Sequence, residues 1–237
     1  MSTNYFLLTK EKDESINSVE NDQIISINNK KVFILPSNLL SYYVSHSLYE
    51  KHLIEWCVQL CSPDKVFLDI GAHTGTYTIA LADKCSHVYS FEPQKMTYYS
   101  LCGSVALSNL ENVTCLQIGL GSEEQIGTNK LKIIGDDGGC SSLHISDTSK
   151  IMKEEDIEIR TLDSFNLTNI GFIKMDVENN ELFVFQGGLE TLKNCNYPKI
   201  FFESNTDNQE LFSYITSLGY RIIKIMGASN MYLAEVA

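Results

Sequence analysis

Two glycines placed just after a carboxylate have the types and the spacing of a ligand-binding turn. Asp69 closes the short apolar run 66–68, and Gly71 and Gly75 bracket the turn that follows. Glycine lets the backbone approach a ligand closely, and a helix that begins near Thr76 would present free N–H groups at the same corner. A strand, a glycine turn and a helix start therefore predict a binding site for a nucleotide-like molecule.

The spacing of this turn indicates which nucleoside it binds. A dinucleotide fingerprint is G-x-G-x-x-G and a Walker A loop needs G-K-[ST], whereas residues 69–75 follow D-x-G-x-x-x-G. A carboxylate suits a pyrophosphate poorly, but it suits the ammonium group of S-adenosylmethionine, which carries no phosphate. Glu92 lies 92 − 71 = 21 residues after Gly71, where an acidic side chain reaches ribose hydroxyls. The pattern predicts a methyl-donor site, and a nicotinamide dehydrogenase is the alternative because Glu92 suits both ligands.

A second set of carboxylates follows two later predicted strands. Asp176 ends one of them, Glu178 opens the helix after it, and Glu203 ends the next strand. Because ligands of open parallel sheets bind at the carboxyl ends of the strands, we expect all three at the edge that holds the donor. Asp176 or Glu178 could take the proton of an acceptor hydroxyl. Asp176, Glu203 and Asn205 could instead bind a divalent cation that acidifies the hydroxyl, but we favour the metal-free alternative because residue types establish no coordination geometry.

Each of these side chains also has a purely structural interpretation. Asp69 could only cap the turn, and Asp176 and Glu178 could cap the helix that follows and favour its dipole. Glu203 is more typical of a structural position, and Lys174 of a strand residue whose stem is buried.

The amino-acid composition limits the classes of protein to which this sequence can belong. The 237 residues suit one sizeable domain with a small extension, and 43% of them are hydrophobic. A net charge of −12 with a pI near 4.8 argues against a nucleic-acid partner, because phosphate binding needs a basic surface. No apolar run has the length of a membrane span, and no secretory signal is recognised. Seven cysteines without zinc spacing favour free thiols in a reducing compartment, which predicts the cytoplasm.

Alternating strand and helix patterns from residue 66 onward predict an α/β fold. Before them, residues 23–35 predict a hairpin that turns at Asn28 and Asn29, and residues 48–61 predict a helix. We expect an N-terminal extension over 1–47, a domain over 48–237, and a substrate-covering loop over 135–146, rich in glycine and small polar residues. The strands are predicted over 66–70, 87–91, 113–118, 172–175, 199–203, 220–226 and 231–236, and the helices over 76–84, 95–110, 180–194 and 208–218.

Taken together, D-I-G-A-H-T-G-T-Y-T, Y-S-F-E-P, T-L-D-S-F, I-K-M-D-V-E-N-N-E, L-E-T-L and F-F-E-S resemble the FkbM family of S-adenosylmethionine-dependent methyltransferases. The resemblance implies a class I (Rossmann-like) methyltransferase fold: a seven-stranded, mostly parallel sheet with an antiparallel last strand and helices on both faces. It also implies the roles of individual residues. The donor loop would comprise Asp69, Gly71, Ala72, His73 and Gly75, the ribose acid Glu92, the adenine wall Gln117 to Gly119, and the catalytic acidic pair Asp176 and Glu178.

The family's pattern is not followed everywhere. His73 stands where asparagine is usual, and Asn179 replaces the glycine usual after D-V-E, although asparagine tolerates left-handed backbone. The resemblance implies an O-methyltransferase acting on a sugar, glycan or other hydroxylated small molecule. The alternatives are an RNA ribose 2'-O-methyltransferase, which the acidic balance disfavours, and a non-catalytic S-adenosylmethionine-binding protein. A nucleobase amino-methyltransferase would show an N-P-P-Y-like turn, where D-V-E-N stands instead.

Overall fold

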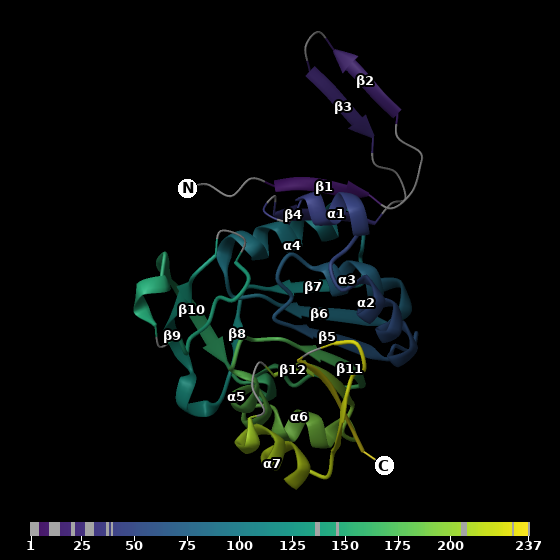
Figure 1. The fold of residues 1–237 in the computed structure, drawn as a ribbon. Helices are drawn as coiled ribbons and strands as arrows, with labels where there is room; N and C mark the ends of the chain where they lie inside the picture. Colours follow the sequence, from purple (N-terminus) through teal and green to yellow (C-terminus); the bar gives the residue numbers. More distant parts are fainter. Residues whose placement is uncertain are drawn as a thin grey trace.

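The chain is described here from a computed structural model, shown as a ribbon in Figure 1. The structure describes residues 5–9, 15–19, 22–26, 31–36, 38, 40–135, 138–145, 147–204, 208–228 and 230–236.

A seven-stranded sheet forms the centre of the molecule, with the strand order β13-β14-β12-β11-β5-β6-β7. Five neighbouring strands run parallel, and β14 is antiparallel to both of its neighbours. The predicted class I sheet with an antiparallel last strand is therefore confirmed. Its strands are β5 (Val66–Ile70), β6 (His87–Phe91), β7 (Val113–Leu116), β11 (Ile170–Met175), β12 (Lys199–Glu203), β13 (Arg221–Lys224) and β14 (Met231–Glu235).

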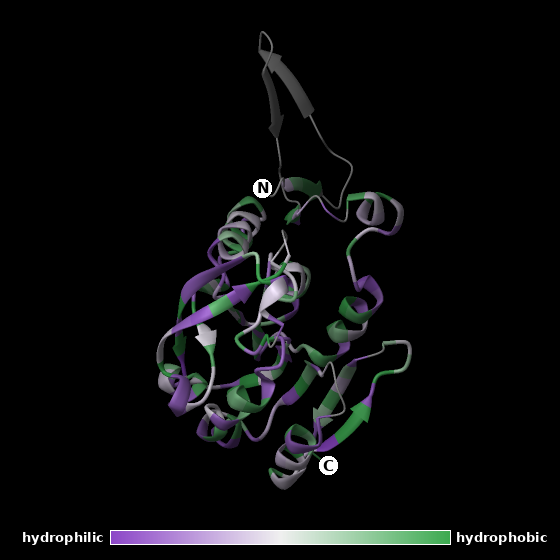
Figure 2. Ribbon diagram, turned by 60° about the vertical axis from the view of Figure 1, so that its left-hand side comes forward, coloured by the Kyte–Doolittle hydropathy of each residue, from purple (hydrophilic) through white to green (hydrophobic). Residues whose placement is uncertain are grey.

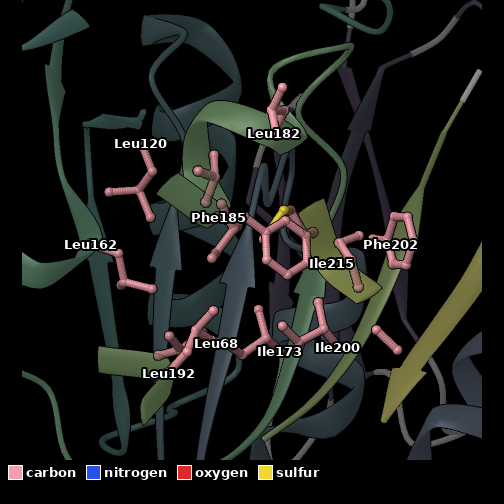
Figure 3. Packing of buried hydrophobic residues seen from close by; sticks show 14 of the residues in the cluster. Leu68, Leu120, Leu162, Ile173, Leu182, Phe185, Leu192, Ile200, Phe202 and Ile215 are labelled. Atoms are coloured by element: carbon pink, nitrogen blue, oxygen red, sulfur yellow. The ribbon is translucent and has the colours of Figure 1, made fainter. Parts of the chain in front are cut away.

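Helices cover both faces of this sheet, because its strands alternate between two apolar clusters. In β5, Leu68 and Ile70 face one cluster and Phe67 faces the other. Figure 3 shows the first cluster, where Leu68, Ile173 and Ile200 from the strands meet side chains from the helices. The covering helices are α2 (Lys51–Cys57), α3 (Thr76–Leu81) and α4 (Lys95–Leu107) on one side, and α5 (Glu181–Gln186), α6 (Leu189–Asn194) and α7 (Gln209–Ser217) on the other.

The same alternation places two charged side chains inside the protein. Asp69 lies two residues after Phe67 in β5, and Lys174 lies two residues after Phe172 in β11. Each charged side chain therefore lies on the same face of the sheet as that phenylalanine. The register aligns Lys174 with Asp69 on adjacent parallel strands. Side chains paired in this way lie on one face at short range, so the fold itself brings the cation and the carboxylate together.

A second, three-stranded sheet with the order β8-β10-β9 was not predicted. It consists of β8 (Gly119–Leu120), β9 (Gly127–Ile133) and β10 (Lys153–Arg160), and its apolar residues form a small separate cluster with Leu143. Figure 2 shows more hydrophilic residues along these strands than along the central ones. The strand β10 was not predicted because it begins with four charged residues, 153–156, and its alternation of buried and exposed residues begins only at Ile157.

The N-terminal strands form, but with partners other than those predicted. β3 (Asp22–Ser26) pairs with β2 (Ser15–Val19), and β4 (Val32–Pro36) pairs with β1 (Tyr5–Thr9). The predicted hairpin between the two halves of 23–35 is therefore wrong, and its turn at Asn28 and Asn29 lies outside the described residues. Both halves have strand patterns, but an apolar pattern does not specify which strand a segment pairs with.

The helical predictions hold with shifted ends. The first predicted helix is α2 followed by the 3-10 turn Val58–Leu60, and α1 (Leu40–His46) precedes it. The predicted helix over 180–194 is broken into α5 and α6 at Gly187 and Gly188, whose backbone leaves helical geometry. Gly187 also passes so close to Gly121 that a Cβ would lie 2.0 Å from the Gly121 carbonyl oxygen. Within the described ranges, no helix combines the length and the apolar character that crossing a bilayer requires.

Candidate active site

A cavity of about 770 Å³, part of it open to solvent, lies at the carboxyl ends of β5, β6 and β11. The predicted site residues that line it are Gly71, His73, Glu92, Gly119, Asp176 and Glu178. Five other described residues that were predicted for the site do not line it, namely Asp69, Ala72, Gly75, Gln117 and Glu203.

The glycine turn forms one wall of the cavity. The N–H groups of Gly71 and Ala72 both donate to the carbonyl oxygen of Phe91, at 3.0 and 2.9 Å. Gly71 has a φ of +74°, and a Cβ there would lie 1.8 Å from the backbone oxygen of Asp176. Only glycine fits this position, because any side chain would collide with the acidic segment on the neighbouring strand.

Asp69 does not reach the cavity. Its side chain is 0% exposed, and Oδ2 accepts from the N–H and the hydroxyl of Thr78 at 3.0 and 2.6 Å. Burial raises the pKa of Asp69, and nearby Lys174 and the bonds from Thr78 oppose that effect. We expected Asp69 to contact a ligand ammonium directly, but its carboxylate is buried behind the cavity. There it binds Thr78 and holds the start of α3 against the end of β5.

Glu92 stands at the end of β6 and lines the cavity, although it is only 7% exposed. Oε1 accepts from the N–H of Gln94 and the hydroxyl of Thr97, at 2.9 and 2.8 Å, and Oε2 accepts from the N–H of His73 at 2.8 Å. Since a carboxylate offers about four acceptor positions, Oε2 retains capacity for one more donor. A ligand hydroxyl in the cavity can therefore bind to Glu92 without displacing a protein group.

An apolar slot continues the cavity beyond Glu92. Ile118, Leu131, Ile157 and Ile159 line it, so the unpredicted small sheet supplies most of its wall. Gly119 lines the cavity as expected, whereas Gln117, also predicted beside an adenine, is exposed and does not line it. A flat aromatic base is the kind of group that such a slot accommodates.

Lys174 lies between the two ends of the site, which its sequence position did not predict. It is 4% exposed, and its Nζ donates to the carbonyl oxygen of Gly71 at 2.7 Å. The same nitrogen lies 3.4 Å from Oδ2 of Asp176 and 3.8 Å from Oδ1 of Asp69. Burial lowers the pKa of Lys174, but the two carboxylates outweigh it and the pKa is raised, so the group stays cationic.

The three predicted carboxylates do converge. One oxygen from each of Asp176, Glu178 and Glu203 lies within 4.8 Å of the others. Burial raises the pKa of Asp176, but Lys174 and a hydrogen bond with Glu203 outweigh it and lower the pKa. Burial and then the charge of Asp176 raise the pKa of Glu203 to about 9. At neutral pH, Asp176 is ionised and Glu203 carries a proton.

Three carboxylate oxygens at this separation could also hold a divalent cation. Asn205, the other predicted ligand, lies outside the described residues. The buried Lys174 already neutralises Asp176 from behind, and Glu203 donates a hydrogen bond to it. Both features reduce the attraction of this set for a cation.

The N-terminal part of the chain also contacts this end of the site. Glu50 precedes α2 and accepts a hydrogen bond from the hydroxyl of Tyr77 at 2.9 Å. Lys174 Nζ lies 5.5 Å from the centre of the Tyr77 ring. Burial raises the pKa of Glu50. The Tyr77 ring, whose hydroxyl is bonded to Glu50, is therefore a further contact of Lys174.

The glycine-rich loop predicted to cover the substrate does lie over the cavity. Within it, residues 138–145, here called the flap, are described, and Gly138 to Leu143 line the cavity. Sequence reasoning missed Lys174, Asn180 and the wall from the small sheet. The lone charge inside the apolar run F-I-K-M was the one signal that could have identified Lys174.

Comparison with known proteins agrees with this geometry. The model of the methyltransferase FkbM domain matches residues 69–222, well over half of the chain. A search of curated proteins found no match.

Solved structures show the same fold. The chain is similar to methyltransferase FkbM from Methylobacillus flagellatus KT, with 20% identity and a TM-score of 0.55 over 73% of this chain and 44% of that one. It is also similar to precorrin-6y C5,15-methyltransferase from Geobacter metallireducens GS-15, with 10% identity and a TM-score of 0.50 over 80% and 90% of the two chains. The chain thus spans less than half the length of the first of these proteins.

Proposed function

The chain belongs to the FkbM family of S-adenosylmethionine-dependent methyltransferases, and we propose that it methylates a hydroxyl group of a sugar, a glycan or another hydroxylated small molecule. The observation that carries the proposal is the position of Lys174. One buried cation contacts both the donor turn, through Gly71, and the acceptor-side carboxylate Asp176. In this proposal Lys174 sets the distance between the donor site and Asp176, the proton acceptor.

In the proposed complex the donor extends along the cavity. Its adenine occupies the apolar slot beside Ile118 and Ile157, its ribose binds to Glu92, and its methionine part follows the turn at Gly71 and His73. Asp69 supports that turn from within the core. The sulfonium then lies on the side of the cavity that Asp176 and Glu178 line, next to the proposed proton acceptor.

The reaction needs alignment and a proton acceptor. A lone pair of the acceptor oxygen attacks the methyl carbon, the carbon–sulfur bond breaks, and its electrons leave the sulfur neutral as a thioether. The hydroxyl proton moves to the carboxylate of Asp176, which Lys174 keeps ionised. Glu203, protonated beside it, donates its hydrogen bond to Asp176 and so holds that carboxylate in place. We propose a metal-free reaction, in which a divalent cation is not needed.

The charge of the site favours this acceptor class over RNA. Asp176, Glu178 and Glu203 lie at the acceptor end, and the chain carries a net charge of −12. Phosphate groups would be repelled from such a surface, whereas neutral polyols donate hydrogen bonds to carboxylates. We also place the protein in the cytoplasm as part of the proposal, because all seven cysteines are free thiols.

Two measurements test the proposal. Calorimetry with S-adenosylhomocysteine tests donor binding, and a turnover assay with a panel of sugars, glycosides and other hydroxylated metabolites tests transfer. For the acceptor so found, Asp176→Asn is expected to lower kcat by about 10²–10⁴-fold because the proton acceptor is lost. Asp156→Asn, an exposed residue paired with Lys130, is the control and should leave kcat unchanged. Donor binding without turnover on any acceptor would support a non-catalytic binding protein instead.

A further inference from the structure

Two segments far apart in the sequence meet at the acceptor end of the cavity. One is the flap, residues 138–145, and the other is the acidic turn, residues 176–180. The hydroxyl of Ser142 donates to the carbonyl oxygen of Glu178 at 2.5 Å. Nε2 of His144 lies 2.8 Å from Oδ1 of Asn180. Two hydrogen-bond contacts therefore connect the flap to the acidic turn.

The acidic turn needs such support because its backbone is strained. Glu178 has a φ of 52° and Asn179 a φ of 74°, so two successive residues with a Cβ are left-handed. This conformation is unfavourable for both, although less so for asparagine, and it persists only where neighbouring groups hold it. The bond from Ser142 ends on the carbonyl between these two residues, so it acts directly on the strained peptide.

Asn180 fixes the other end of the turn. It is 4% exposed, and its Nδ2 donates to the carbonyl oxygen of Leu120 at 2.9 Å, while Oδ1 accepts from Gln125 Nε2 at 2.9 Å. The ring of His144 stacks on Phe183, with centroids 5.4 Å apart and planes 13° from parallel. The imidazole is therefore held in place by α5 and can restrain Asn180.

The flap also contacts the donor end. The hydroxyl of Ser141 donates to Oε1 of Gln94 at 3.0 Å, and the N–H of Gln94 donates to Glu92. Gly138 approaches the same place so closely that a Cβ would lie 2.7 Å from Cγ2 of Thr97. Gln94 and Thr97, which these two flap residues contact, both donate hydrogen bonds to Glu92, the predicted ribose-binding residue. One continuous segment therefore touches the donor end and the strained acceptor turn.

We propose that Ser142 and His144 are positioning residues that couple donor binding to the placement of Glu178. The inference rests on the proposed function, in that the donor occupies the cavity under the flap. A bound donor packs against Gly138 to Ser141 and holds the flap in the position that the structure shows. The flap then holds Glu178 and Asn179 through Ser142 and His144, so a bound donor restrains the acceptor end as well as its own.

Hydrogen–deuterium exchange with S-adenosylhomocysteine as the probe tests this coupling without an acceptor. In the unmodified protein the probe should slow exchange in both 138–145 and 176–180, by at least about tenfold. In Ser142→Ala and in His144→Ala, the probe should still bind and protect the flap, but protection of 176–180 should fall to less than about twofold. His144→Gln keeps an Nε2 donor for Asn180 and should restore most of the protection.

The control is Ser164→Ala, which removes a similar hydroxyl-to-carbonyl bond, 2.7 Å to Thr161, in a part of the chain that does not line the cavity. Its protection pattern should equal that of the unmodified protein. Equal protection of 176–180 in both flap variants would overturn the coupling, and so would a probe that binds the unmodified protein without protecting that segment. Failure of the probe to bind the unmodified protein counts against the proposed function itself and is detected separately by calorimetry.

Discussion

The donor turn and the acidic turn follow neighbouring strands of one sheet, yet they are built differently. In the donor turn, glycine occupies two of the three left-handed positions, at φ +74° and +87°, and His73 occupies the third at φ +51°. Asp69 behind this turn is bonded to Thr78 within the same segment. In the acidic turn, Glu178 and Asn179 occupy left-handed positions that suit glycine better. Its restraints come from the distant flap and from Lys174.

The difference shows two ways of arranging a binding site. The donor end is held mainly by hydrogen bonds among residues 69–97, with one further bond from Lys174 and one from the flap. The acceptor end is a crowded set of carboxylates whose charges and backbone depend on other parts of the fold. The following predictions test this contrast, from the largest expected effect to the smallest.

Removing the cation should affect both ends at once. Lys174→Met leaves Asp69 buried without its charge partner, so we expect the free energy of unfolding to fall by about 3–5 kcal/mol. Denaturant titration measures this change. Lys224→Met, at an exposed lysine over the Tyr232 ring, is the matched control and should have little effect. A loss for Lys174→Met no larger than that of the control would show that Lys174 does not join the two ends.

A side chain at Gly71 should damage the donor turn and push the acidic turn away. Gly71→Ala combines an unfavourable φ with a collision at Asp176, so we expect a loss of stability of about 2–4 kcal/mol and no binding of S-adenosylhomocysteine. Gly227→Ala has a similar φ of +83° but nothing within 4 Å, so it isolates the backbone cost of about 1–2 kcal/mol. Normal donor affinity in Gly71→Ala would contradict the proposed donor site.

Glu92 should matter to the donor and not to the acceptor. Glu92→Gln weakens charge-assisted bonds, and we expect S-adenosylhomocysteine affinity to fall about 10–100-fold in calorimetry. Glu155→Gln is the control, because Glu155 accepts the N–H of Lys95 outside the cavity. If Glu92→Gln instead raised the acceptor KM and spared donor affinity, the two ends would have been assigned in the wrong order.

The acceptor end should give a pH signature of its own. Burial and Asp176 raise the pKa of Glu203 to about 9, above the usual carboxyl value. Its contribution to stability is therefore complete below the unfolded pKa of about 4.3 and is lost as pH rises toward 9. Since Glu203 is only half-buried and water screens it, we expect a fall of about 1–2 kcal/mol over that range. Urea titrations of Glu203→Gln should show a flatter pH dependence, and an unchanged one would contradict the assignment.

Chelation should have the smallest effect. Because Lys174 and the proton on Glu203 already compensate Asp176, we expect EDTA to change turnover by less than about twofold. Restoration of lost activity by added Mg²⁺ or Mn²⁺ would instead assign Asp176, Glu178 and Glu203 as metal ligands.

The donor end could be predicted from the sequence because its geometry is local. The run before Asp69, the glycine turn and Glu92 lie within the 27 residues 66–92, and Gly71, His73 and Glu92 from this segment line the cavity. The exception is Asp69, because spacing does not specify whether a carboxylate faces a ligand or a helix N–H.

At the acceptor end, the sequence predicts which carboxylates come together but not their protonation states. Asp176, Glu178 and Glu203 were expected to converge and do so. Their protonation states depend on Lys174, whose partner Asp69 is 105 residues away in sequence and adjacent only through strand register. The small sheet, the exchanged N-terminal pairings and the flap contacts likewise depend on tertiary pairing, which local patterns do not specify.

A crystal structure with S-adenosylhomocysteine tests the central claim most directly, namely that Lys174 joins a donor turn to an acceptor-side carboxylate. The account predicts the ribose on Glu92, the base against Ile118 and Ile157, and the sulfur on the side of the cavity formed by Asp176 and Glu178. A ligand bound elsewhere, or one whose sulfur faces away from Asp176, would contradict it.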